Sequence, residues 1–220
     1  MAIATNLATS PVALKRLGEV DYESAWDLQR QFHEEISIGK RANTLLLLEH
    51  PPIFTAGRRT LDSERPIDGS KVIDVDRGGK ITFHGPGQIV GYPIVRLREP
   101  QNVVGFVREI ESALIAVCRE FEIAAERYCE RSGVWIREPK PGGDRKIAAI
   151  GIRVATGTTM HGFALNVDPD LSYYDRIVPC GITDAGVTSI AKELNRKIST
   201  SEILPVVEKH IFEALARVAI

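Results

Sequence analysis

Cysteine is scarce in this chain, with three residues among 220. An odd number cannot pair completely within one chain, and the spacing matches neither a zinc ribbon nor a Cys-x-x-Cys motif. A long apolar segment is missing as well. Nothing approaches the roughly 20 continuous apolar residues of a membrane helix, and residues 1–10 contain neither a signal-like apolar stretch nor an arginine. These absences predict a soluble, cytoplasmic protein that has no membrane partner.

A dominant charge is absent too. The chain carries 28 basic and 29 acidic residues, and aromatic residues make up only 6% of it, which gives no reason to expect a nucleic-acid partner. Common functional motifs are also missing: the chain has no His-Glu-x-x-His, no Gly-x-Ser-x-Gly and no phosphate loop ending in Gly-Lys-Ser/Thr. We therefore expect no metal, no serine hydrolase and no ordinary P-loop nucleotide site.

Three segments have the start signals and the apolar spacing of amphipathic helices. Asp21, Asn102 and Ser199 are N-cap residues, and apolar residues follow each of them at steps of three and four. Glu202 completes a capping box with Ser199, and Gly39 is a stop signal for the first helix. The pattern predicts helices after residues 21 and 102, and a third from 199 to the end of the chain.

Eight further segments are typical of strands, so strands outnumber helices. The turns at 139–144 and 156–158 are short enough for hairpins, which join antiparallel neighbours. Clustered strands with helices between them predict an α+β fold, in which a mainly antiparallel or mixed sheet has flanking helices on one side. No linker divides the chain, so residues 1–220 are expected to form a single domain. The predicted strands are 44–49, 72–76, 81–84, 89–97, 124–128, 133–137, 146–155 and 159–167.

Residues 77–88 have a composition that an ordinary strand would not have. Four glycines stand there beside a lysine and a histidine, in the order Arg-Gly-Gly-Lys-Ile-Thr-Phe-His-Gly-Pro-Gly-Gln. Glycine loses more conformational entropy on folding than other residues and offers no side chain to pack, so such a cluster indicates a backbone that a ligand approaches closely.

Two residues are candidates for nucleophilic chemistry and its proton transfers. Cys180 stands between a proline and a glycine, which presents its thiol on a turn; the alternative is a small buried hydrophobe. Lys146 begins an apolar strand, where it is either a solvated lysine or a partly desolvated one able to transfer protons. Cys118 lies on the apolar stripe of the second helix and is expected in the core, and Cys129 is expected to be structural.

The histidines divide into two groups. His84 and His161 each lie in a strand end that contains glycine, so they are candidates for one pocket, as hydrogen-bond donors or as a general base. A satisfied core histidine is the alternative for either. His50 precedes two prolines and is expected to mark a turn, while His33 and His210 lie on helices and are discounted.

Several separated motifs resemble the lipoyl(octanoyl) transferase family, in the order in which that family has them. Residues 77–88 with Tyr92 resemble its Arg-Gly-Gly, Thr-aromatic-His, Gly-Gln and Tyr signature. Further likeness lies at 45–57, 146–153, 161–166 and 179–182, so the resemblance covers residues 44–190. It implies the fold of biotin- and lipoate-protein ligases, which periodicity alone does not distinguish from other α+β folds.

The resemblance also implies roles for individual residues. Cys180, in Pro-Cys-Gly, would be the residue that is acylated, and Lys146, in Lys-Ile-Ala-x-Ile-Gly, its proton-transfer partner. His161 and Asn166 would support the site. The octanoyl chain would lie in an apolar tunnel, and the substrate-binding residues would be Arg77, Gly78, Gly79, Lys80, Ile81, Thr82, Phe83, His84, Ala149, Ile150, Gly151, Gly162, Phe163 and Ala164.

The implied partners are octanoyl-acyl carrier protein as donor and lipoyl domains as acceptors, those of 2-oxoacid dehydrogenase E2 subunits and the glycine cleavage H protein. No cofactor is implied beyond the phosphopantetheine arm of the carrier protein. Because carrier proteins and lipoyl domains are typically acidic, we expect a local positive surface. Two alternatives stay open, an ATP-dependent lipoate or biotin ligase and a non-catalytic lipoyl-domain-binding module. The candidate surface residues are Arg58, Arg59, Arg77, Lys80, Arg145 and Arg153.

Overall fold

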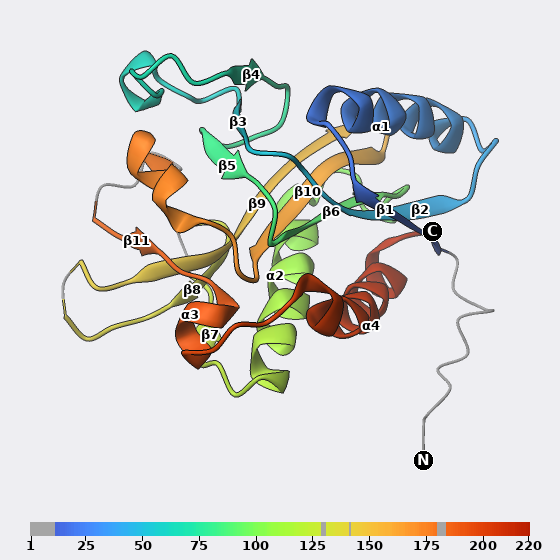
Figure 1. Ribbon diagram of the computed structural model, residues 1–220. Helices are drawn as coiled ribbons and strands as arrows, with labels where there is room; N and C mark the ends of the chain where they lie inside the picture. Colours follow the sequence, from blue (N-terminus) through green and yellow to red (C-terminus); the bar gives the residue numbers. More distant parts are fainter. Residues whose placement is uncertain (1–11, 129–130, 141, 180–183) are drawn as a thin grey trace.

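A main sheet forms the centre of the molecule, and a small second sheet lies above it in the view of Figure 1. The computed structural model describes residues 12–128, 131–140, 142–179 and 184–220. The main sheet has the strand order β1-β2-β6-β10-β9-β8-β7 with β11 beside β9, and the second has the order β4-β3-β5. The strands are β1 (Val12–Glu19), β2 (Asn43–Glu49), β3 (Ile53–Ala56), β4 (Val72–Asp74), β5 (Thr82–His84), β6 (Gln88–Ile94), β7 (Ala125–Glu126), β8 (Val134–Ile136), β9 (Arg145–Ala155), β10 (Thr158–Asn166) and β11 (Gly186–Val187).

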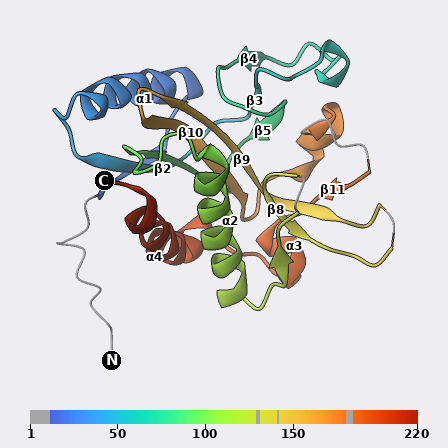
Figure 2. The ribbon, with the colours of Figure 1, turned by 180° about the vertical axis from the view of Figure 1, so that it is seen from behind.

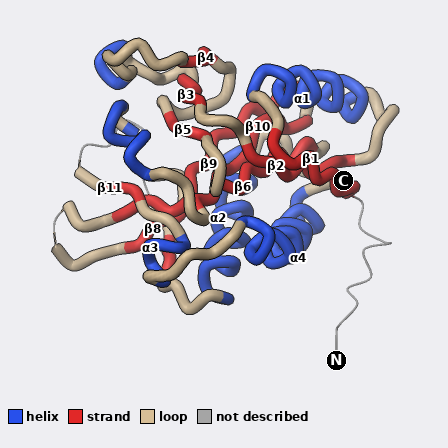
Figure 3. Tube along the Cα trace, in the orientation of Figure 1, coloured by secondary structure: helices blue, strands red, loops and turns tan. Residues whose placement is uncertain are grey.

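Helices cover both faces of the main sheet, so the expectation of helices on one side is wrong. Leu46 and Leu48 of β2 pack with α1 (Tyr22–Ser37), whereas Leu45 and Leu47 belong to the core shared with α2 (Val103–Glu120) and α4 (Thr200–Val218). Figure 3 shows the sheet between these two layers. A continuous apolar run is what a strand buried on both faces requires, and the four leucines already carried that signal.

The three predicted helices and their caps are confirmed. Asp21 Oδ1 accepts a hydrogen bond from the Ser24 amide at 2.9 Å, and Ser199 and Glu202 form the reciprocal capping box. Figure 2 shows α2 and α4 side by side, with α2 in front of the sheet in that view. Cys118 of α2 is fully buried, as expected. Shorter helical turns are α3 (Ile190–Leu194), η2 (Asp62–Glu64) and η3 (Leu171–Arg176). In the described part of the chain, no helix has the length and apolar character needed to cross a membrane.

The mixed sheet follows from two kinds of connection. β8-β9 and β9-β10 are antiparallel hairpins at the predicted turns, whereas β1 and β2 are parallel because α1 crosses between them. Sequence analysis did not predict β1, β3, β11 or α3. β1 is an edge strand with several exposed charged residues, and β3 has four residues directly after two prolines, so neither has the apolar alternation of a typical strand. The α+β fold and mixed sheet are confirmed.

Gly162→Ala is expected to lower the free energy of unfolding by at least about 2 kcal/mol. A Cβ atom at this position of β10 would lie 1.9 Å from the Gly91 carbonyl oxygen and 2.7 Å from Pro93 Cδ, both on the neighbouring strand β6. The backbone oxygen cannot move away without disturbing strand pairing. Gly186→Ala is the control, because its Cβ would have no neighbour closer than Arg145 Cγ at 3.8 Å. Urea denaturation measures both, and equal midpoints would contradict this close approach.

Candidate active site

A cavity of about 370 Å³ opens over the face of β9 and β10. Residues of both sheets, of the glycine-rich segment and of the start of α1 line it. Its floor has small side chains: Ala149 and Ala164 are paired across β9 and β10, as are Gly151 and Gly162. The lining residues are Tyr22, Arg59, Arg77, Gly79, Lys80, Thr82, His84, Tyr92, Arg131, Ser132, Lys146, Ala149, Ile150, Gly151, His161, Gly162, Phe163 and Ala164.

The cavity lining includes exposed and buried residues. Arg59 and Ser132 are exposed, so solvent reaches the cavity beside them. Tyr22, His84 and His161 are all buried and contribute rings to the lining. An extended ligand can therefore enter beside the exposed residues and contact buried aromatic rings inside.

Strand alternation divides the expected binding residues of β5. Thr82 and His84 line the cavity, whereas Ile81 and Phe83 pack in the core of the second sheet with Phe54. Ile81 and Phe83 are therefore not cavity residues, because successive side chains of a strand point to opposite faces. Gly78 is also absent from the lining; its amide donates to the Ile152 carbonyl at 3.1 Å and fixes the segment to β9.

Arg77 organises the glycine-rich segment from inside. Its Nη1 donates to the carbonyls of Lys80 at 2.8 Å and Gly78 at 3.1 Å, and its Nη2 donates to the Thr55 carbonyl at 2.7 Å. Gly57 must lack a side chain here, since a Cβ atom would lie 2.7 Å from Arg77 Nη1. The buried guanidinium therefore shapes the backbone and does not belong to the positive surface expected from the sequence.

Lys146 is buried at the edge of the cavity, where only 8% of it is exposed. Its Nζ lies 4.6 Å from the ring centroid of Trp135, the residue paired with it on β8. Gly133, at φ +115°, makes room for the lysine, because a Cβ there would lie 3.3 Å from Lys146 Cε. Among the described residues no carboxylate forms an ion pair with Lys146, so the amine is held by an aromatic face.

Cys180 and Cys129 lie outside the described residues. The described chain on both sides of Cys180 is tied to the fold. The Val178 amide donates to the Glu64 carbonyl at 3.1 Å, and Val187 of β11 pairs in register with the cavity residue Lys146. The Thr188 amide also donates to the Lys146 carbonyl at 3.0 Å.

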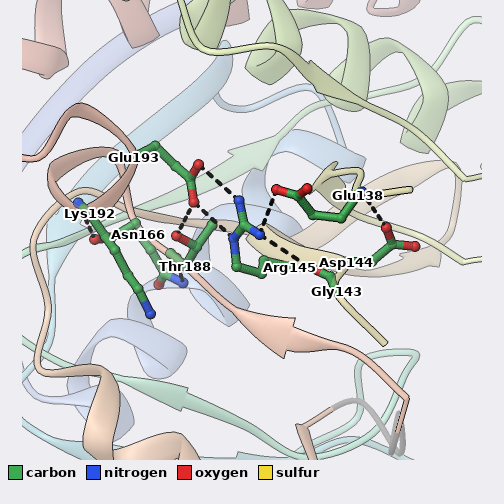
Figure 4. A network of polar contacts seen from close by, with 9 residues as sticks. Glu138, Gly143, Asp144, Arg145, Asn166, Thr188, Lys192 and Glu193 are labelled. Atoms are coloured by element: carbon green, nitrogen blue, oxygen red, sulfur yellow. Dashed lines mark hydrogen bonds and ion pairs between the residues drawn. The ribbon is translucent and has the colours of Figure 1, made fainter. Parts of the chain in front are cut away.

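Arg145, the residue before Lys146, joins several segments of the chain, and Figure 4 shows its contacts with Glu138 and Glu193. Its guanidinium donates to Glu193 at 3.1 Å and to Glu138 at 3.0 Å, while Thr188 donates to the same Glu193 at 2.5 Å. These bonds connect the β8-β9 hairpin, α3 and the chain after β11. The cation is neutralised within the fold, which argues against its expected place on a free docking surface.

His84 is held by a chain of amide side chains. Its Nδ1 donates to Gln88 Oε1 at 2.8 Å, and Gln88 Nε2 donates to Asn166 Oδ1 at 2.8 Å. Because an amide oxygen only accepts, Nδ1 carries the proton and Nε2 remains an acceptor. Burial holds the pKa of His84 well below its ordinary value, so the ring is neutral. Asn166 does not line the cavity and acts on His84 through Gln88.

His50 is buried behind the cavity, which the expected turn at residues 51–52 did not indicate. Its Nδ1 donates to the Val20 carbonyl at 2.6 Å, so its Nε2 accepts from the Tyr92 hydroxyl at 2.8 Å. Burial lowers the pKa of His50 to about 4. Tyr22 stacks against His84 with ring centroids 5.8 Å apart. Tyr22, His84 and Tyr92 therefore give the cavity lining neutral rings rather than charged groups.

His161 forms an acid-histidine pair that sequence analysis missed. Its Nε2 donates to Asp76 Oδ1 at 2.7 Å, and Arg153 Nη1 donates to Asp76 Oδ2 at 2.5 Å. The hydrogen bond from His161, then the nearby cations, lower the pKa of Asp76, whereas burial lowers that of His161. His161 has φ +59°, and its amide donates to Gln29 Oε1 at 2.9 Å. No sequence signal connected Asp76 or Gln29 with a histidine so far along the chain.

The described residues contain no group of three or more histidine, cysteine, aspartate or glutamate side chains placed to hold a metal ion. The cavity instead combines a small-residue floor, neutral aromatic rings and a buried lysine. Such a lining suits an apolar chain whose reactive end lies beside the amine.

Known proteins are similar to this chain over nearly its whole length. The family model described as the lipoyl protein ligase A/B catalytic domain matches residues 21–212. An octanoyltransferase of Salinispora arenicola is 58% identical over 92% of this chain and 95% of its own length. One from Mycolicibacterium gilvum is 55% identical over 98% and 90%.

Solved structures support the fold at low sequence identity. A bipartite lipoate protein ligase of Thermoplasma acidophilum matches with a TM-score of 0.70 and 16% identity, covering 92% of this chain and 83% of that one. The biotin protein ligase of Aquifex aeolicus matches with a TM-score of 0.52 and 16% identity, covering 93% and 69%. The expected biotin- and lipoate-protein ligase fold is thereby confirmed.

Proposed function

We propose that this chain, which belongs to the lipoyl protein ligase A/B catalytic domain family, is an octanoyltransferase that works through Cys180 and Lys146. The donor is octanoyl-acyl carrier protein. The acceptors are the lysines of lipoyl domains, including those of 2-oxoacid dehydrogenase E2 subunits and the glycine cleavage H protein. The observation that carries the proposal is the cavity with its small-residue floor and buried Lys146, in a chain more than half identical to octanoyltransferases.

In the first step, the Cys180 thiolate attacks the carbonyl carbon of the octanoyl thioester. Lys146 takes the thiol proton and returns it to the departing phosphopantetheine thiol, so the octanoyl group ends as a thioester on Cys180. An ordinary cysteine, with a pKa near ~8.5, is mostly protonated at neutral pH and needs such a partner. The pairing of β11 with Lys146 on one side of Cys180, and the bond of Val178 to Glu64 on the other, support a position of the thiol near the amine.

In the second step, the acceptor lysine amine attacks the acyl-enzyme. Lys146 removes a proton from the attacking amine, the carbon–sulfur bond breaks, and the Cys180 thiol is regenerated together with the amide product. One thioester exchanges for another in the first step, and the amide formed in the second is lower in energy. No ATP and no resident cofactor is needed.

The cavity supports selection of a medium acyl chain. Burying six methylenes at about 0.8 kcal/mol each gives roughly 5 kcal/mol in favour of octanoyl over a short acyl group. The buried rings of Tyr22, His84 and His161 oppose chains that are much longer. Between adjacent lengths, the discrimination is expected to be modest, at about 1–3 kcal/mol.

The experiment compares two routes to the same product. The protein is incubated with a lipoyl domain and either octanoyl-acyl carrier protein without ATP, or free octanoate with ATP and magnesium. We expect octanoylation of the lipoyl domain from the carrier protein alone. Modification only with octanoate and ATP would establish the ligase, and modification by neither route would favour the non-catalytic binding module.

A further inference from the structure

The exposed part of the cavity lining includes a cation, Arg59, that has no charge partner among the described residues. In the part of the chain that the structure describes, its guanidinium forms no ion pair and no hydrogen bond. The neighbouring Arg58 is equally exposed and unpaired among those residues, but it does not line the cavity.

Apart from Arg58 and the buried Lys146, the other cations around the site already have partners in the fold. Lys80 pairs with Glu64, and Arg131 pairs with Asp184 at 2.7 Å. Arg153 pairs with Asp76, and Arg145 lies between Glu138 and Glu193, while Arg77 is buried against carbonyl oxygens. Counting only the described residues, the positive surface expected from six cations is therefore reduced to Arg58 and Arg59. Of these two, Arg59 is the one that lines the cavity.

The backbone holds Arg59 in a defined place. Its amide donates to the Gly79 carbonyl at 3.1 Å, and the Arg58 amide donates to the Arg77 carbonyl at 3.2 Å. The Thr60 amide closes the turn by donating to the Gly57 carbonyl at 3.0 Å. Arg59 is thus fixed to the same glycine-rich segment that lines the cavity, which lowers the cost of ordering it around an anion.

We propose that Arg59 binds the phosphate of the phosphopantetheine arm that delivers the acyl group. The inference rests on the proposed function, because that function brings an acyl-pantetheine into the cavity. Pantetheine itself is uncharged, and its phosphate lies at the end opposite the thioester. With the acyl chain among the buried residues of the lining, the arm leaves toward solvent past the exposed Arg59, whose planar guanidinium is suited to a phosphate oxygen pair.

Equilibrium binding separates this subsite from the transfer activity. S-octanoyl-4′-phosphopantetheine and S-octanoyl-pantetheine differ only in the phosphate. Calorimetric titration of each into the Cys180→Ser protein, which does not react, measures the phosphate preference. We expect the phosphorylated ligand to bind about 10- to 100-fold more tightly.

In the Cys180→Ser protein, the further substitution Arg59→Gln should remove the phosphate preference and leave the affinity for the unphosphorylated ligand unchanged. Adding Arg58→Gln is the matched control and should keep most of the preference, because Arg58 is exposed and adjacent but lies outside the cavity lining. Equal affinities for the two ligands in the Cys180→Ser protein that retains Arg59 would overturn the proposal. An Arg59→Gln substitution that weakens both ligands by the same factor would overturn it as well.

A parallel transfer assay tests the Arg59 subsite and the proposed octanoyl transfer separately. If wild type transfers octanoyl from the carrier protein but the binding assay shows no phosphate preference, the Arg59 subsite is wrong and the proposed function stands. If the preference is present and depends on Arg59 while no transfer occurs, the subsite is supported and the proposed function fails.

Discussion

Cys180→Ser is expected to abolish octanoyl transfer, with a loss on the order of 10⁴-fold or more in kcat/KM. The serine hydroxyl has nearly the size of the thiol but is a far poorer nucleophile at neutral pH, so the acyl-enzyme should not form. Transfer from octanoyl-acyl carrier protein to a lipoyl domain, followed by mass spectrometry of the acceptor, measures the loss.

Cys118→Ala is the control for this substitution. Cys118 is fully buried on α2, and burial raises the pKa of its thiol to about 12, so it cannot serve as a thiolate. We expect its removal to lower thermal stability through lost packing while the transfer rate stays within a few-fold of wild type. If Cys180→Ser transferred octanoyl at the wild-type rate, or if a folded Cys118→Ala protein lost transfer, the assignment of Cys180 as the nucleophile would be wrong.

Lys146→Met should lower kcat/KM about 10²- to 10⁴-fold, the range typical of a lost general acid and base. Methionine keeps an unbranched apolar stem against Trp135, so folding should survive. Both half-reactions should slow, and rapid-quench measurement of Cys180 acylation and of transfer to the acceptor resolves them.

Two further variants separate the functions of the Lys146 amine. Lys146→Arg keeps the positive charge but not a proton that is readily released, so we expect it to be impaired nearly as much as methionine. Lys15→Met removes another lysine above an aromatic ring, since Lys15 Nζ lies 5.5 Å from the Phe32 ring centroid outside the cavity, and transfer should be unchanged. Full activity of Lys146→Arg would mean that charge alone is required.

The features that sequence predicts well here are local ones. Asp21, Asn102 and Ser199 cap helices because each side chain accepts from an amide three residues later, a relation that the sequence displays directly. The cavity likewise uses Gly79, which the composition of residues 77–88 marked, and Gly151 and Gly162, which the family resemblance implied. Strand alternation was also visible in the sequence, and it would have separated the cavity-lining Thr82 and His84 from Ile81 and Phe83, which pack in the core.

Interactions between distant residues were not predictable in the same way. Asp76 meets His161, 85 positions away, and His50 meets Tyr92, 42 positions away. Neither local sequence pattern indicates the distant partner, because it is the order of the strands in the sheet that brings the two residues together. Charge pairing has the same origin: only the fold distinguishes Arg59 from the neutralised Arg153.

The most direct test of the central claim is the intact mass of the protein after incubation with octanoyl-acyl carrier protein alone. We expect wild type to gain one octanoyl group that hydroxylamine removes and that a lipoyl domain discharges, while Cys180→Ser gains none. An adduct of equal extent on both proteins, or no adduct on wild type while the lipoyl domain is still octanoylated, would contradict transfer through a Cys180 thioester.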